Sequence, residues 1–285
     1  MRRSTAGSRL ELIAAEAARP IDHPDALDYI FRGRAAQSKP PTRDNYAEAV
    51  GWFERACGLD PRSADAQSWL AITLTARVLD QMSVSVAADI ARAEGLVRQA
   101  LEAAPRSPLA HSAKGQPLRA QRRYAEAIAE YETALAFNRN WVRALGPLGQ
   151  CKLFCGSIDE LIPLVERAIR LSPRDPFIGV WYFRIGLAHL LQSRIQDAIV
   201  WLDKARSANP ELPYVHSGLA SAYALRGETE QSAIELAEAR RLSFDGRYSS
   251  FACLKAIAYF GVPKIRALYE ATYFAGLRKA GMPEE

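Results

Sequence analysis

The feature that most limits how this 285-residue chain can fold is a ten-residue segment that recurs six times. The six copies read WFERACGLDP, LVRQALEAAP, YETALAFNRN, LVERAIRLSP, WLDKARSANP and LAEARRLSFD. Their final proline, or the residue equivalent to it, falls at Pro61, Pro105, Arg139, Pro173, Pro210 and Phe244, so the successive steps are 44, 34, 34, 37 and 34 residues. A period of this length predicts stacked units that bury their apolar faces against one another.

The second helix expected in each unit has a small, a large and a small position at helical spacing. These triads are Ala49–Phe53–Ala56, Ala93–Val97–Ala100, Ala127–Tyr131–Ala134, Leu161–Val165–Ala168, Ala198–Leu202–Ala205 and Ser232–Leu236–Ala239. A large–small pair precedes most of them, at Leu70–Ala71, Leu148–Gly149, Ile185–Gly186, Leu219–Ala220 and, more weakly, Lys114–Gly115. Such spacing puts the residues on one helix face, and the small ones let two helix backbones approach. The pattern predicts two antiparallel helices in each unit.

This period and pattern resemble the tetratricopeptide repeat family. The resemblance implies an all-α, superhelical solenoid of about six antiparallel helix-pair repeats with a C-terminal helical cap. We expect an N-terminal tail with a short helix at 1–21, repeats at 22–246 and capping helices at 247–285. In the cap, Ile265, Leu268, Thr272 and Gly276 share one helix face, and Tyr269, Tyr273 and Phe274 are expected to be packing residues.

Three features depart from a regular repeat. The 44-residue step places about ten extra residues near VLDQMSVSVAADI, which should lengthen the helices or the turn of the second unit. Pro117 and Pro147 fall inside expected first helices, where proline predicts a kink or a shortened helix. Ser8 and Glu11 have the spacing of a capping box that would open a short N-terminal helix.

Composition narrows the class of protein. The formal charge is +5 and the pI is near 9.1, but the basic residues alternate with acidic ones, as on solvated helix faces. No apolar run reaches the roughly 18 residues of a membrane span, and the basic start lacks the apolar core of a signal peptide. We therefore expect a cytoplasmic chain that does not enter a membrane.

The cysteines give no sign of a metal centre. Cys57, Cys151, Cys155 and Cys253 form no CxxC pair. Cys151 and Cys155 could share a helix face as half of a metal site, yet small buried side chains are the favoured interpretation. We expect neither a metal nor a cofactor.

The resemblance also implies where partners bind. In this family the first helices line an inner surface that holds peptides or helices of partner proteins. The inner-face candidates are hydrogen-bonding or cationic residues: Ser68, Ser112, Gln116, Arg119, Arg143, Gln150, Tyr214, Ser217 and Ser221. The Lys and Asn cluster with which some members clamp chaperone tails is missing, but Arg119 and Arg143 could engage a carboxylate in another geometry.

A second resemblance covers the chain from SRLELIAAEAARP to its end, including RSANPELPYVHSGLASAYALRGE and VPKIRALYEATYFAGLRKAGMPEE. It is similar to the C-terminal repeat region of bacterial adenylate cyclase-like signalling proteins, in which a cyclase or winged-helix domain precedes the repeats. The resemblance implies a non-catalytic sensory or regulatory part, either a fragment or a stand-alone relative.

Catalysis is not expected. The sequence contains no P-loop, GxGxxG turn or GxSxG elbow, and His111, His189 and His216 are separated by whole units. Nucleic-acid binding stays open as the alternative, because helical-pair repeats can read RNA one base per unit. Against it, the equivalent inner positions vary between Ser, Gly, Phe and Arg, and no basic stripe runs along the repeats.

Overall fold

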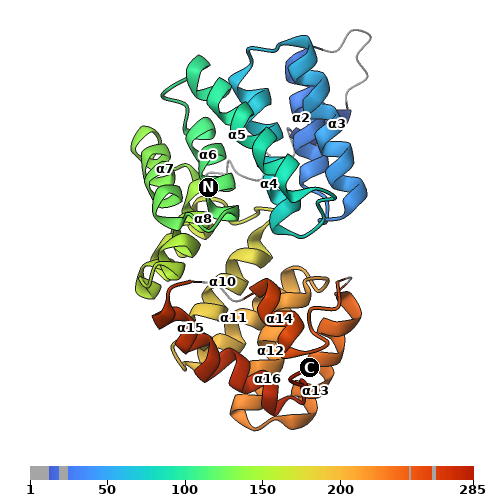
Figure 1. Ribbon diagram of the computed structural model, residues 1–285, viewed down its shortest axis with the longest axis vertical. Coiled ribbons are helices and arrows are strands. Elements are labelled where there is room, and N and C mark those ends of the chain that lie inside the picture. The colour runs from blue at the N-terminus through green and yellow to red at the C-terminus, as the bar shows by residue number, and fades with distance from the viewer. Residues whose placement is uncertain (1–12, 19–24, 244, 259–260) are drawn as a thin grey trace, which may run out of the picture. The chain divides into compact units, whose positions relative to one another are not determined.

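The computed structural model describes residues 13–18, 25–243, 245–258 and 261–285, and in these ranges every regular element is a helix. The chain divides into two compact units, residues 1–151 and 152–285 (Figure 1). The expected capping box of Ser8 and Glu11 lies outside the described residues.

Unit 1 is built from helix pairs. Its helices are α2 (Ala26–Gln37), α3 (Arg43–Leu59), α4 (Ala64–Leu79), α5 (Val86–Ala103), α6 (Pro108–Ala120), α7 (Tyr124–Phe137) and the larger part of α8 (Val142–Phe154). Helix α2 packs on α3, α4 on α5 and α6 on α7, while the neighbouring first helices α4 and α6 also touch. This is the pairing that the small–large–small triads predict.

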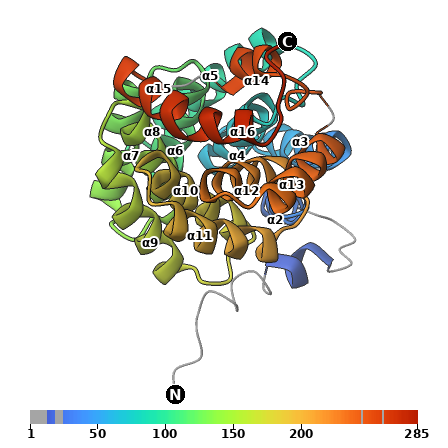
Figure 2. The same ribbon diagram turned by 90° about the horizontal axis from the view of Figure 1, so that it is seen from below.

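Unit 2 continues the same plan and then departs from it. A 3₁₀ turn, η1 (Ile158–Glu160), leads into α9 (Leu161–Leu171), α10 (Ile178–Leu191), α11 (Ile195–Ala208), α12 (Pro213–Arg226) and α13 (Thr229–Leu242). The chain ends in α14 (Phe251–Ala258), α15 (Pro263–Tyr269), a π-helical turn η2 (Glu270–Phe274) and α16 (Ala275–Lys279). Helices α10 and α11 pair, as do α12 and α13 (Figure 2). The predicted α-solenoid of helix-pair repeats is confirmed.

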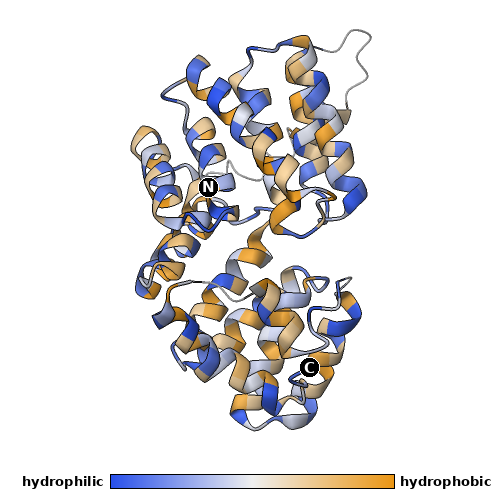
Figure 3. Ribbon diagram, in the orientation of Figure 1, coloured by the Kyte–Doolittle hydropathy of each residue, from blue (hydrophilic) through white to orange (hydrophobic). Residues whose placement is uncertain are grey.

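The predicted triads form the core between paired helices. All eighteen of their side chains are at most 2% exposed, and hydrophobic positions line the helices in stripes (Figure 3). A small residue of the first helix faces the large one: a Cβ built on Gly115 would lie 2.5 Å from the Tyr131 ring, and one on Gly186 would lie 2.7 Å from Leu202. Glycine is therefore required at these crossings by the close approach of two helices.

The ten extra residues of the second unit are spread over both helices and their turn. Compared with α6, α7 and the turn between them, α4 is three residues longer, the α4–α5 turn three longer and α5 four longer. Asp89 in the first turn of α5 holds this longer turn, because it accepts hydrogen bonds from Arg77 Nε and Ser83 Oγ, both at 2.6 Å.

The two prolines leave their helices nearly intact. Helix α6 continues three residues past Pro117, and α8 continues seven residues past Pro147. Each helix has 13 residues, against 14 in α10 and α12, so the prolines shorten the first helices by one residue at most.

A repeated polar link joins the end of one repeat to the next. His111 at the start of α6 lies 3.0 Å from the Pro105 carbonyl oxygen through Nε2 and 2.7 Å from Glu130 of α7 through Nδ1. The same places are taken by His216 with Pro210 and Glu235, and Gln67 donates to the Pro61 carbonyl oxygen. These polar side chains thus fasten the turns between repeats, which is a structural role.

Candidate partner-binding surface

Three of the predicted residues meet around one guanidinium in unit 1. Arg119, in the last turn of α6, donates through Nη1 to Gln150 Oε1 of α8 at 2.5 Å and through Nη2 to Gln116 Oε1 at 2.9 Å. Its Nε is buried and has no acceptor among the described residues. We call Gln116, Arg119 and Gln150 the Arg119 cluster. Both acceptors are neutral amides, so neither of these hydrogen bonds gives the half-buried cation of Arg119 a carboxylate.

Three other half-buried cations of this chain are paired with carboxylates. Arg77 pairs with Asp89, Arg247 Nη2 lies 2.5 Å from Asp245, and Lys152 Nζ lies 2.7 Å from Glu160. A cation taken partly out of water is usually matched by an anion, because desolvation without a counter-charge costs free energy. The Arg119 cluster therefore combines a half-buried cation with neutral acceptors, an arrangement whose donors suit an anionic group.

A second group of cations gathers on an aromatic ring. The Arg143 guanidinium of α8 lies 4.4 Å from the ring centroid of Trp69 in α4, and that of Arg34 in α2 lies 5.1 Å from it. Each such contact contributes roughly 0.5–2 kcal/mol. Arg143 was predicted, whereas Arg34 was missed because the first repeat fits the pattern only loosely, and Trp69 carried no signal beyond that of a core residue.

The predicted serines are buried and do not lie on an open surface. Ser68, Ser112, Ser217 and Ser221 are all at most 1% exposed. In unit 2, Ser217 and Ser221 bond to the C-terminal segment, and Tyr214 packs on Phe183 with ring centroids 4.6 Å apart. In this structure the four serine hydroxyls are closed to a partner, because small side chains at these positions admit a neighbouring element. The partly accessible members of the predicted set are Gln116, Arg119, Arg143 and Gln150 in unit 1 and Tyr214 in unit 2.

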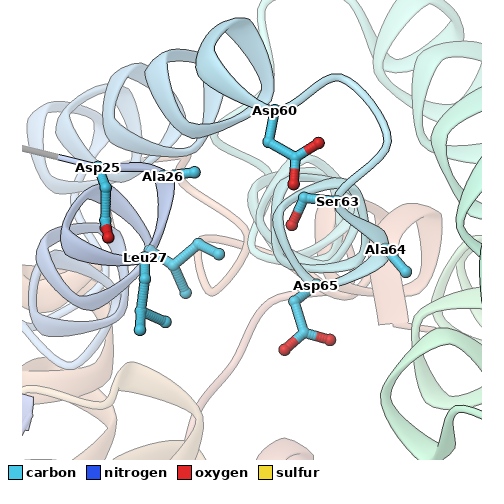
Figure 4. Close-up of a pocket in the computed structure, with 8 residues that line it drawn as sticks. Asp25, Ala26, Leu27, Asp60, Ser63, Ala64 and Asp65 are labelled. Carbon is cyan, nitrogen blue, oxygen red and sulfur yellow. The ribbon is translucent and has the colours of Figure 1, made fainter.

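Unit 1 also has a shallow cavity of about 440 Å³ at the start of α2 and α4 (Figure 4). Its carboxylates come from Asp25, Asp60 and Asp65. Asp25 caps α2 by accepting from the Asp28 N–H at 2.9 Å, and Asp60 accepts from the Arg62 N–H at 3.1 Å. Two of the three acidic groups are thus engaged in local backbone bonds, and we assign no ligand to this cavity.

The described residues offer neither a cluster of metal ligands nor a membrane-spanning helix. Among them, no group of three or more His, Cys, Asp and Glu side chains could hold a metal ion. In the same part of the chain, no helix is both long and apolar enough to cross a membrane.

Comparison with known proteins agrees with this fold. Residues 86–140 match the family model described as tetratricopeptide repeat. No curated protein matches the chain. A chain of the APC/C hetero-tetramer Cut9–Hcn1 is similar to this protein in structure, with a TM-score of 0.66 and 15% identity, over 88% of this chain and 45% of that one.

Two more solved structures share the architecture. The human IFIT1 dimer with m7Gppp-AAAA gives a TM-score of 0.64 at 19% identity, over 81% of this chain and 54% of that one. PilF of Pseudomonas aeruginosa gives a TM-score of 0.55 at 18% identity, over 76% of this chain and 91% of that one. The chain thus spans about half the length of the Cut9–Hcn1 and IFIT1 chains that it matches. The match at residues 86–140 and the shared fold support the tetratricopeptide repeat as the unit from which this chain is built.

Proposed function

We propose that this chain is a protein-interaction scaffold, and that the first helices of unit 1 bind a partner segment that carries carboxylates. The observation that carries the proposal is Arg119, a half-buried guanidinium that donates to the neutral amide oxygens of Gln116 and Gln150. A carboxylate that took the place of one amide would replace a neutral acceptor with an anion, so the hydrogen bond from the guanidinium would join two opposite charges; hydrogen bonds to charged groups contribute about 1.5–3 kcal/mol.

The cation–π group extends this surface beyond one residue. Arg143 and Arg34 lie over Trp69, and both guanidiniums come from first helices. Arginine keeps its planar donor fork while it stacks on a ring, so such a residue can hold a carboxylate and an aromatic contact together. A partner segment with two or more acidic residues fits this arrangement better than a neutral one.

The wider setting that we propose is the regulatory part of a bacterial adenylate cyclase-like signalling protein in the cytoplasm, with a cyclase or winged-helix domain upstream. Support comes from the sequence resemblance of the segment from Ser8 to the C-terminus. In this setting the chain binds its partner without catalysing a reaction. The Cut9–Hcn1 structure, which shares the fold, is itself an assembly of proteins.

Nucleic acid is the partner class that the experiment must separate from protein, since the IFIT1 structure of similar fold contains a capped RNA. Purified chain is used as bait in a cell extract at low and high salt, with and without nuclease. The proposal expects a discrete protein that survives nuclease treatment. Recovery of nucleic acid that disappears at high salt, as counterion release requires, would overturn it in favour of the RNA alternative.

A further inference from the structure

We propose that the inner face of unit 2 is a binding site for a helical segment, and that the chain's own C-terminal module occupies it as an intramolecular ligand. The C-terminal module is defined as residues 247–285. This inference concerns residues of unit 2 and does not depend on the function proposed for unit 1.

The position of the module is the first observation. Helix α16 and the π-helical turn η2 lie along α12, and η2 also touches α10 (Figure 2). Helices α10 and α12 are the first helices of their pairs, and first helices carry the predicted inner-face residues. The module follows the last repeat in the chain. It also covers the inner face of unit 2, on which a partner was expected.

Two hydroxyl groups of α12 make specific contacts with the module. Ser217 Oγ lies 2.7 Å from the Tyr273 hydroxyl, and Ser221 Oγ donates to the Tyr273 backbone carbonyl oxygen at 2.9 Å. These links recognise both a side chain and the backbone of a helical segment, as a binding site would.

Close backbone approach sets which helix fits. A Cβ built on Gly276 would lie 2.8 Å from the Ser221 carbonyl carbon and closer still to its oxygen. Real Cβ atoms do not come so near a backbone, so only glycine brings α16 against α12 at this point. The site therefore selects a helix with glycine at the crossing and tyrosine three residues before it.

Unit 1 provides an internal comparison for this site. Ser68 and Ser112 stand at the same place in their repeats as Ser217, and both hydroxyls are buried without a partner among the described residues. Ser217 donates to the Tyr214 carbonyl oxygen of its own helix at 3.0 Å, so the repeat supplies one partner for this serine. The Tyr273 hydroxyl of the module is an additional partner, which Ser68 and Ser112 do not have among the described residues.

The module carries its own set of contacts, so it can leave as one piece. Phe251 packs edge-on against Phe274 at 5.9 Å, and Lys255 Nζ lies 2.6 Å from Glu270. The Phe251 N–H donates to the Pro283 carbonyl oxygen at 2.9 Å, which ties the chain end to the start of α14. Just before the module, Gly246 has a φ of 66° and nothing within 4 Å of a built Cβ, so the backbone there is open to a change of direction.

The test compares two leucine substitutions in the full chain. Gly276→Leu forces a side chain into the Ser221 backbone, whereas Ala271→Leu adds the same side chain at an exposed position of the same segment. The probe is a labelled synthetic peptide of residues 247–285, titrated into each protein. In the wild-type chain the tethered module competes at an effective concentration of the order of millimolar, so the probe should not bind.

We expect the probe to bind the Gly276→Leu chain and to ignore the wild-type and Ala271→Leu chains. In hydrogen exchange, the amides of the module in the Gly276→Leu chain should exchange at least tenfold faster than in the wild type, which corresponds to about 1.4 kcal/mol less protection. The exchange rates of the α10–α13 amides should stay within about twofold of the wild-type rates. Three results would overturn the proposal: no binding of the probe, loss of protection throughout α10–α13, or a module whose protection is unchanged.

A milder pair of variants covers the case in which Gly276→Leu fails to fold. Ser221→Ala and Tyr273→Phe remove the hydroxyl links and keep the shape of the crossing. Each should speed the exchange of the module about three- to tenfold without changing α10–α13, in line with the loss of one net hydrogen bond. Equal loss of protection in α10–α13 would show that the module is part of the core, and the proposal would be wrong.

Discussion

The crossing of Gly115 and Tyr131 offers a quantitative test of how the repeats are held together. A Cβ at residue 115 would lie 2.5 Å, 2.6 Å and 3.0 Å from three carbons of the Tyr131 ring, where ordinary carbon contacts are about 3.5–4.0 Å. The ring is fully buried. Overpacking costs about 1–3 kcal/mol, while alanine in place of glycine gains about 1 kcal/mol in helix propensity. The closest approach falls about 1 Å short of an ordinary contact, so we expect Gly115→Ala to destabilise unit 1 by about 1–2 kcal/mol.

Gly51→Ala is the matched control. Gly51 also lies inside a helix of unit 1, α3, but nothing lies within 4 Å of its built Cβ. The same substitution there should stabilise the unit by up to about 1 kcal/mol. The free energies of unfolding of both variants are measured by urea unfolding, monitored by far-UV circular dichroism, in the cooperative transition of unit 1.

A double-mutant cycle checks that the Tyr131 ring causes the loss of stability in Gly115→Ala. Tyr131→Leu removes the clashing ring, so Gly115→Ala should cost less in the Tyr131→Leu background than in the wild type. The reasoning is refuted if Gly115→Ala stabilises the chain as Gly51→Ala does, or if the two substitutions at the crossing are simply additive.

Two further predictions concern pH. Burial opposes protonation of His216, but its hydrogen bonds to Glu235 and the Pro210 carbonyl oxygen, together with the charges of Glu235 and Glu238, raise the pKa of His216 above the ordinary value. This stabilisation is therefore present below about pH 6.5 and is lost as the pH rises through the folded-state pKa. His216→Gln introduces the residue type that Gln67 provides in the second repeat. It should make the melting temperature depend less on pH between about pH 6 and 8, and an unchanged dependence of melting temperature on pH would contradict the prediction. Burial alone would raise the pKa of Asp89, but hydrogen bonds from Arg77 and Ser83, together with the charges of Arg77 and Arg92, hold the pKa below the ordinary value. This stabilisation is therefore present at neutral pH and is lost as the pH falls through the folded-state pKa. Asp89→Asn should lower the free energy of unfolding by about 2 kcal/mol at neutral pH and by little in strong acid, as measured by urea unfolding. An equal loss at both pH values would refute a stabilising role for the charge of Asp89.

The repeat period predicted the parts of the fold that depend on local pattern. The triads came out buried because a small–large–small spacing determines one helix face, and the ten extra residues of the second unit appeared where the longest step placed them. The link from His111 to Glu130 was missed, although His216 and Glu235 repeat its 19-residue spacing and would have given a signal.

The rest of the candidate site depends on long-range packing, which spacing alone does not encode. Ser217 and Ser221 were assigned to the inner face, yet they bond to Tyr273, more than fifty residues away. Gly276 was recognised as part of a helix face but not as the place where two backbones meet. Arg119 was predicted from its position, whereas its neutral amide partners became visible only in the structure.

The most direct test of the scaffold account is the affinity of the captured protein for the chain, measured by titration calorimetry. Arg119→Ala with Arg143→Ala should weaken binding by about 1.5 kcal/mol or more, the loss expected for charged hydrogen bonds. The matched control is Arg98→Ala with Arg170→Ala, which removes the same charge from exposed positions of the second helices α5 and α9. Unchanged affinity in the first double variant, or equal loss in both, would contradict the claim that the first helices of unit 1 bind the partner.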